Sequence, residues 1–135
     1  TMRFKYKRIT SECIRPIIPV RLKYNGRSVS YEALIDSGAD MCVFPAEIGE
    51  LVGIDIKKGA VGDLTGVIGN AEKIYYHTID IELGGNATQV VAGFSYSKNI
   101  SSFGLLGQSV VFSVYTIKFM YRKGFIDIEP DTKVN

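Results

Sequence analysis

The chain has 135 residues, and 46% of them are hydrophobic, which is enough for the core of one globular domain and too many for a disordered chain. A formal net charge of +2 gives no electrostatic argument for binding nucleic acid or a membrane surface. With two cysteines, Cys13 and Cys42, and a single histidine, His77, the composition excludes a disulfide framework and a Cys/His zinc site. We therefore expect no metal, no cofactor and two reduced thiols.

The chain divides into three segments. Residues 1–12 form a basic N-terminal extension, residues 13–130 form the folded domain, and residues 131–135 form a polar tail. The basic cluster of the extension (Arg3, Lys5, Lys7 and Arg8) is interpreted as a solvated leading segment. No apolar run is long enough to span a bilayer, and the N-terminus lacks the apolar core of a signal peptide. We therefore expect a cytoplasmic protein.

The first half of the domain predicts a hairpin followed by a short helix. Arg15 to Leu22 has the partly alternating apolar pattern of a strand, and Asn25-Gly26 is typical of a two-residue turn whose positions both need positive φ. The partner strand, Ser28 to Ile35, ends at Asp36. Pro45 is then expected to open a helix over Ala46 to Val52, since proline is tolerated in the first turn.

The second half predicts several short strands joined by glycine-rich turns. Lys57 to Leu83 is read as a hairpin whose tip is Thr65 to Asn70, and Gly84-Gly85-Asn86 is read as the next turn. Further strands are expected at Ala87 to Phe94, Val114 to Tyr121 and Phe125 to Glu129, with a helical turn at Gln108 to Ser113. This pattern predicts a small all-β barrel or sandwich with one or two short helices.

The most informative stretch is Ala33 to Asp40, which reads Ala-Leu-Ile-Asp-Ser-Gly-Ala-Asp. An apolar run that ends at Asp36-Ser37-Gly38 indicates a buried strand stopping at a tight turn, a position that often carries catalytic groups. Gly38 allows a close turn of the backbone, and Ser37 can hydrogen-bond within it. Taken alone, the triplet is also typical of an ordinary surface turn.

A second feature changes this interpretation. Phe103 to Gln108 is a short apolar run closed by Gly107, and the glycine-bearing hairpin lies between it and Asp36. In this order of elements the chain resembles the retropepsins, the single-domain aspartic proteases of retroviral type. The resemblance covers nearly the whole chain, from Pro16 to Pro130.

The resemblance implies a fold and a set of site residues. The fold would be the closed retropepsin barrel, with the hairpin as a flap over the substrate. Asp36, Ser37 and Gly38 would be the catalytic residues. The substrate would be contacted by Ala39, Asp40, Gly66, Val67, Ile68, Gly69 and Leu105. In this family an arginine usually follows the apolar-apolar-glycine element, whereas this chain has Gln108, which can hydrogen-bond Asp40 but cannot neutralise it.

The count of acids implies a dimer. Hydrolysis of a peptide by carboxylates needs two acids at one water molecule, and this chain has one Asp-Ser-Gly triplet. Both Asp36 residues would therefore lie on the two-fold axis of a homodimer that binds a polypeptide substrate.

Three hypotheses follow, and they belong to different functional classes. The leading one is a homodimeric aspartic endopeptidase with no nucleic-acid or membrane partner. The second is a catalytically silent retropepsin-like domain that binds peptides or protein partners, because a fold does not guarantee its chemistry. The third is an unrelated small β-barrel binding module in which Asp36 is only a turn residue.

Overall fold

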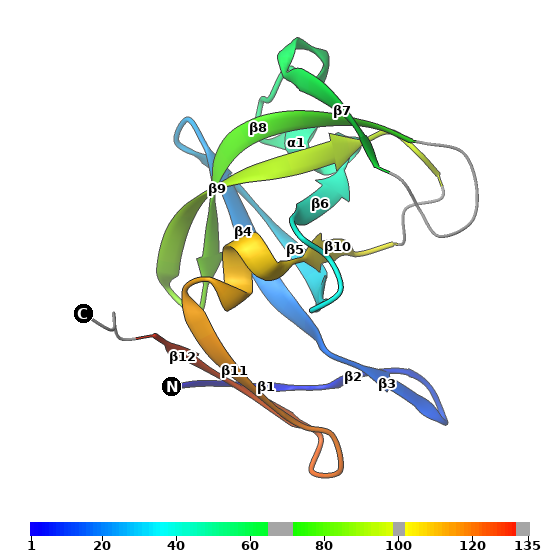
Figure 1. Ribbon diagram of the computed structural model, residues 1–135, viewed down its shortest axis with the longest axis vertical. Coiled ribbons are helices and arrows are strands. Elements are labelled where there is room, and N and C mark those ends of the chain that lie inside the picture. Colours follow the sequence, from blue (N-terminus) through cyan, green and yellow to red (C-terminus); the bar gives the residue numbers. More distant parts are fainter. Residues whose placement is uncertain (65–71, 99–101, 132–135) are drawn as a thin grey trace.

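The computed structural model describes residues 1–64, 72–98 and 102–131, and within these ranges six strands close into a barrel (Figure 1). Neighbouring strands follow the order β4-β5-β10-β6-β9-β8, and pairing of β8 with β4 closes the circle. A further strand, β7, extends the sheet beyond β8. The bounds are Ile17–Tyr24 (β4), Arg27–Ile35 (β5), Cys42–Pro45 (β6), Ala60–Leu64 (β7), Glu72–Leu83 (β8), Asn86–Ser95 (β9) and Gly104–Leu106 (β10). The predicted small all-β barrel is confirmed.

Apolar side chains from every barrel strand fill the interior. Phe44 on β6 and Phe94 on β9 are paired across the two strands, both are fully buried, and their ring centroids lie 6.2 Å apart. Ile18 and Leu22 on β4 face the same core, whereas Pro19 and Arg21 of the same strand alternate with the buried residues and are exposed. Burying one such side chain contributes roughly 1.5–3 kcal/mol, so this core fixes the register of the strands that carry the site.

The structure contains the turn predicted at Asn25-Gly26 and the helix predicted after Pro45. Asn25 and Gly26 have φ of 47° and 79°, as the predicted two-residue turn requires. Helix α1 spans Ala46–Leu51, with Pro45 immediately before it. Two short helical turns follow, η1 at Ile56–Lys58 and η2 at Gln108–Phe112. Among the described residues, no helix is both long and apolar enough to cross a membrane.

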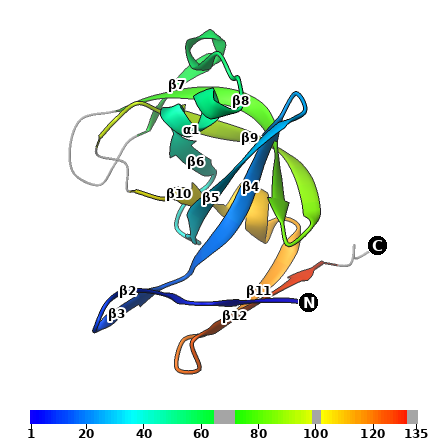
Figure 2. The ribbon, with the colours of Figure 1, turned by 180° about the vertical axis from the view of Figure 1, so that it is seen from behind.

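A second, three-stranded sheet lies below the barrel (Figures 1 and 2). Its order is β1-β12-β11, with bounds Met2–Lys5 (β1), Phe125–Pro130 (β12) and Tyr115–Met120 (β11). A separate hairpin, β2 (Lys7–Thr10) with β3 (Cys13–Arg15), projects from the body.

The N-terminal extension is therefore partly a strand, which the sequence reading had not assigned. Met2, Phe4 and Tyr6 alternate with basic residues and pack against the core, while Arg3 forms an ion pair with Asp127 on β12. The apolar residues of this segment alternate with basic ones, so the segment was interpreted as a charged cluster and not as a strand. The strand that it pairs with, β12, lies more than a hundred residues away in the sequence.

Candidate active site

The loop that carries Asp36 joins two strands of the barrel that do not pair with each other. Strand β5 ends at Ile35, which is buried, and β6 begins at Cys42. Strand β10 fills the space between them, parallel to β5 with Leu106 opposite Ile35, and antiparallel to β6 with Leu105 opposite Val43. The loop of residues 36–41, called the acid loop below, therefore crosses over the end of β10.

Hydrogen bonds hold Asp36 at the start of this loop. Its backbone N–H donates to the Leu106 carbonyl at 3.0 Å, which ties the acid to β10. The Gly38 N–H donates to Oδ1 of the Asp36 carboxylate at 2.9 Å, and the Ala39 N–H donates to the Asp36 carbonyl at 3.2 Å. The turn is therefore closed by the side chain of Asp36, whereas the sequence suggested a hydrogen bond from Ser37. One carboxylate oxygen is fixed by this bond, so the acid has a defined orientation.

The segment that follows β10 clamps the other side of the acid loop. The backbone N–H groups of Gln108 and Ser109 donate to the carbonyls of Ala39 and Asp40 at 2.8 and 2.9 Å. The Gln108 side-chain amide donates to the Ser37 carbonyl at 2.6 Å. Gln108 lies beside the acid loop as the sequence suggested, but its side chain holds the Ser37 carbonyl and not the Asp40 carboxylate.

Gly107 is required where this clamp meets the acid loop. A Cβ atom at Gly107 would lie 2.4 Å from the Met41 carbonyl oxygen and 2.6 Å from that of Ala39. Both are backbone atoms that cannot rotate away. The two segments therefore touch backbone to backbone, which glycine alone permits.

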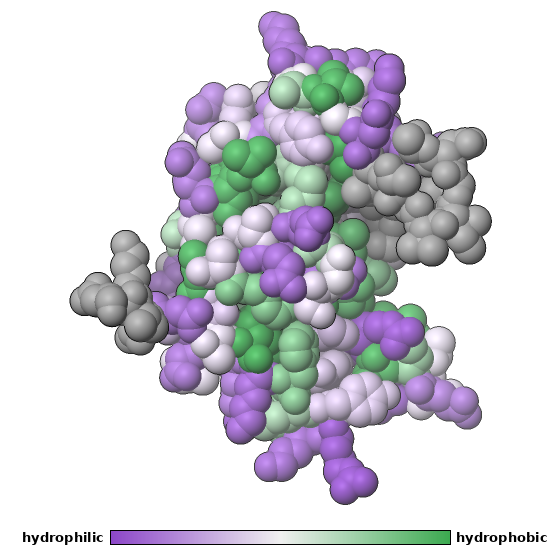
Figure 3. Space-filling model, viewed as in Figure 1, coloured by the Kyte–Doolittle hydropathy of each residue, from purple (hydrophilic) through white to green (hydrophobic). Residues whose placement is uncertain are grey.

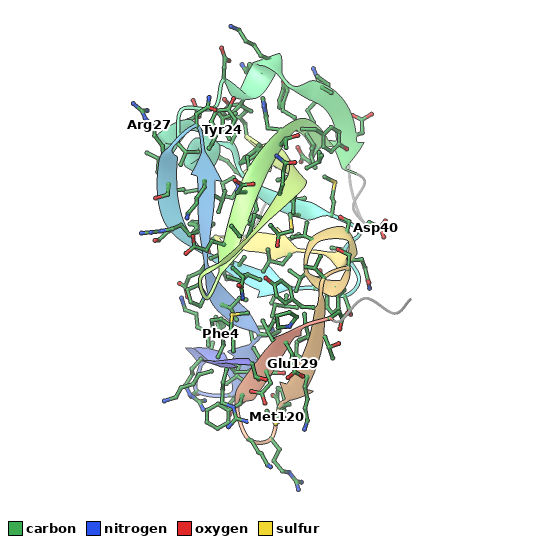
Figure 4. All side chains as sticks on the ribbon, turned by 90° about the vertical axis from the view of Figure 1, so that its left-hand side faces the viewer. Phe4, Tyr24, Arg27, Asp40, Met120 and Glu129 are labelled. Atoms are coloured by element: carbon green, nitrogen blue, oxygen red, sulfur yellow. The ribbon has the colours of Figure 1, made fainter. Side chains whose placement is uncertain are left out.

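The acid loop is open to solvent in the single chain. Ser37, Gly38 and Asp40 are exposed, and Asp36 and Ala39 are half-buried. Figure 4 shows Asp40 at one side of the molecule. Leu105, the remaining predicted substrate residue within the described ranges, is half-buried on β10 beside β5. The structure therefore brings Asp36, Ser37, Gly38, Ala39, Asp40 and Leu105 to one end of the barrel.

The predicted flap residues Gly66, Val67, Ile68 and Gly69 lie outside the described residues. The strands that lead to and from them are described. Strands β7 and β8 pair antiparallel, with Leu64 opposite Glu72, so a hairpin stands at the expected place in the chain.

Two features of the site region were not anticipated from the sequence. The Tyr31 hydroxyl on β5 donates to the Ser102 carbonyl at 2.8 Å and so anchors the segment that precedes β10. The partners are 71 residues apart, and no local signal could have paired them. Burial also raises the pKa of the Cys42 thiol to about 12, so this residue next to the acid loop stays a neutral thiol at physiological pH.

Comparison with known proteins agrees with this geometry. A sequence profile for a family described as aspartyl protease matches residues 19–110, and no curated protein matches the sequence. A crystal structure of a retropepsin-like aspartic protease from Rickettsia conorii superposes with a TM-score of 0.67 at 15% identity, covering 95% of this chain and 89% of that one. EIAV protease in complex with the inhibitor HBY-793 superposes with a TM-score of 0.54 at 17% identity, covering 79% of this chain and 93% of that one.

The chain belongs to the aspartyl protease family, and its barrel has the retropepsin-like fold. At these identities the two solved structures establish the fold alone, so the activity, the assembly and the roles of single residues are argued separately below.

Proposed function

We propose that the protein is an aspartic endopeptidase that acts as a homodimer, with one Asp36 from each chain at the active site. The observation that carries the proposal is the acid loop itself. One carboxylate is held by a hydrogen bond at the end of a barrel strand, while the adjacent Ser37 and Gly38 remain exposed in the single chain. A half-built site of this kind needs a second copy to supply the second acid.

The chemistry follows from two carboxylates at one water molecule. Because two carboxylates in contact cannot both ionise, the pair shares one proton. The ionised Asp36 takes a proton from the water, and the water oxygen attacks the peptide carbonyl carbon. The protonated Asp36 of the other chain gives its proton to the carbonyl oxygen, which forms a tetrahedral intermediate. The Asp36 that took the water's proton then gives it to the peptide nitrogen while the other Asp36 removes a proton from a hydroxyl group of the intermediate. The C–N bond breaks, the products are a carboxylic acid and an amine, and the pair again shares one proton. The Gly38 N–H keeps the carboxylate that accepts the water's proton oriented throughout.

The remaining residues of the site would bind the substrate. Ala39 and Leu105, with Val67 and Ile68, would supply apolar walls, and Gly66 and Gly69 would let the flap bend over the peptide. Asp40 and Gly38 would contact the substrate backbone. We therefore expect cleavage between bulky apolar or aromatic residues, within an extended segment of about six to eight residues held by backbone hydrogen bonds.

Replacement of Asp36 by asparagine is the decisive experiment. Asparagine is isosteric and can still accept the Gly38 N–H bond, so Asp36→Asn should keep the fold and lose cleavage of an unfolded protein substrate. Asp55→Asn is the matched control, because Asp55 is an exposed residue paired with Lys58 away from the acid loop. Cleavage by Asp36→Asn at the wild-type rate would exclude the mechanism, whereas a wild-type protein that cleaves nothing would leave the silent binding domain as the better hypothesis.

Mixing wild-type and Asp36→Asn chains tests whether the site is shared. With equal amounts and free exchange, random pairing places two acids in about a quarter of the dimers. The mixture should therefore show about a quarter of the activity of wild type at the same total concentration. A residual activity near one half would mean that each chain works alone, and the homodimeric site would be wrong.

A further inference from the structure

The chain that leads into β10 is held by a tyrosine side chain and not by backbone pairing. Strand β10 pairs parallel with β5, with Gly104 opposite Ala33 and Leu106 opposite Ile35. Continued backwards, this register would place Ser102 opposite Tyr31, although among the described residues the ladder begins only at Gly104. The Tyr31 hydroxyl donates to the Ser102 carbonyl at 2.8 Å. This bond therefore continues the attachment to β5 where the backbone ladder ends.

Tyr31 is itself a fixed point of the barrel. Its backbone lies within β5, opposite the buried Val20 on β4, and its half-buried ring packs against the core. Burial raises the pKa of the Tyr31 hydroxyl, and the carboxylates of Glu47 and Glu32 raise it further, so the group stays protonated and can donate. A tyrosine hydroxyl also stands further from its own backbone than the spacing of about 4.8 Å between paired strands. The bond can therefore hold a segment that backbone pairing with β5 does not reach.

The held segment presents apolar side chains on the face that turns away from the core. Side chains alternate between the two faces of a strand. Gly104 faces the barrel interior, because an added Cβ atom would lie 2.4 Å from the Phe44 ring, and Leu106 is fully buried. Leu105 lies between them and is half-buried on the opposite face. By the same alternation we expect the half-buried Phe103 on the face of Leu105. Figure 3 shows apolar surface at the height where Figure 1 draws β10, next to more polar surface.

Both ends of this apolar wall, residues 103–105, are tied to the strand that delivers the acid. After the wall, the Leu106 carbonyl accepts the Asp36 N–H at 3.0 Å. Before the wall, the Ser102 carbonyl accepts the Tyr31 hydroxyl, earlier on the same strand. Loss of the first bond would displace the acid, whereas loss of the second would free the wall and leave the acid in place. The two bonds therefore divide the work between catalysis and substrate selection.

We propose that Tyr31 is a positioning residue for substrate selection, whose hydroxyl fixes the apolar wall and so sets the size of the side chain that the site accepts. This inference rests on the proposed endopeptidase, in which Leu105 contacts the substrate. A wall held at both ends keeps one shape and contacts a bulky apolar side chain closely. A wall held only at the acid would relax, so that bulky and small side chains would be bound more equally.

Replacing Tyr31 by phenylalanine removes the hydroxyl and keeps the ring. For a peptide with phenylalanine at the cleaved bond, KM should rise by a few-fold to about tenfold, the equivalent of one hydrogen bond. The value of kcat should stay unchanged, because the bonds of Asp36 to Leu106 and Gly38 are kept. The ratio of kcat/KM between this peptide and the same peptide with alanine at that position should fall by a similar factor.

Tyr24→Phe is the matched control. Tyr24 is a half-buried tyrosine of β4 that packs against the same core, and Figure 4 shows it on the side of the barrel away from Asp40. This variant should keep the wild-type KM, kcat and phenylalanine-to-alanine ratio. The melting temperature of both variants is measured alongside, because a purely structural role of the Tyr31 hydroxyl would lower it without changing the ratio.

Two results would overturn the proposal. The first is a Tyr31→Phe protein with the wild-type KM and the wild-type ratio between the two peptides. The second is a kcat that falls at unchanged KM, which would mean that the Tyr31 hydroxyl acts on the acid and not on the wall.

Peptide binding separates this proposal from the proposed activity. The binding partners are Asp36→Asn and the double variant Asp36→Asn with Tyr31→Phe, each titrated by calorimetry with an apolar peptide of about eight residues that carries phenylalanine at its centre. The double variant should bind a few-fold to about tenfold more weakly. If this difference appears but wild type cleaves nothing, the positioning role stands and the proposed activity fails. If wild type cleaves and the difference is absent, the activity stands and the positioning role is wrong.

Discussion

Replacing Gly107 by alanine tests the contact on which the geometry of the acid loop depends. The added Cβ would lie 2.4 Å from the Met41 carbonyl oxygen, whereas real Cβ atoms essentially never approach other atoms closer than 3.0 Å. The acid loop and η2 must therefore move apart by at least about 0.6 Å. Overpacking of this kind costs about 1–3 kcal/mol of unfolding free energy. A misplacement of about 1 Å at a catalytic site can cost about a hundredfold in rate, so we expect kcat to fall between about tenfold and a hundredfold.

Gly26→Ala is the control that separates displacement of the acid loop from loss of stability. Gly26 has φ of 79° with no atom within 4 Å of an added Cβ, and its hairpin, marked by Tyr24 and Arg27 in Figure 4, lies on the side away from Asp40. Strain at this turn costs about 1–2 kcal/mol, similar to the expected loss for Gly107→Ala.

The assay compares kcat on an unfolded protein substrate with the melting temperature of each variant. Each kcal/mol should lower the melting temperature by about 3–5 °C in a chain of this size. Gly107→Ala should therefore lose both activity and stability, and Gly26→Ala stability alone. A Gly107→Ala protein with wild-type kcat and melting temperature would refute the rigid contact between η2 and the acid loop.

Two further predictions follow from the contacts of the acid loop. Gln108→Leu removes the amide that holds the Ser37 carbonyl and should lower kcat about tenfold, the equivalent of one hydrogen bond, with little change in melting temperature because Gln108 is exposed. Gln89→Leu, at another exposed position, is the control and should change neither kcat nor the melting temperature. An unaffected kcat in Gln108→Leu would show that the bond has no positioning role. Because burial raises the pKa of the Cys42 thiol to about 12, iodoacetamide at pH 8 should leave Cys42 unlabelled in the folded protein and label it after unfolding, as read by mass spectrometry, and labelling of Cys42 before unfolding would contradict its burial.

The sequence by itself determined the features that depend on neighbouring residues. Asn25-Gly26 predicts its turn because few residue types tolerate positive φ at two successive positions. The apolar run before Asp36 predicts a buried strand, and the glycine-rich spacing of short strands predicts a small barrel. Asp36 could be selected as the candidate acid because strand, acid, hydroxyl and glycine stand in direct succession.

Only the tertiary structure decided how that acid is held. The Gln108 amide and the Ser37 carbonyl are 71 residues apart, and whether they meet depends on β10 lying between β5 and β6. Strand β1 finds its partner β12 across almost the full length of the chain, which no propensity of Met2 to Lys5 specifies. Core packing decides which distant strands become neighbours and form hydrogen bonds. The preference of a segment for extended structure does not determine which strand it pairs with. The residue that carries the chemistry could therefore be found in the sequence, whereas its orientation is a property of the assembled barrel.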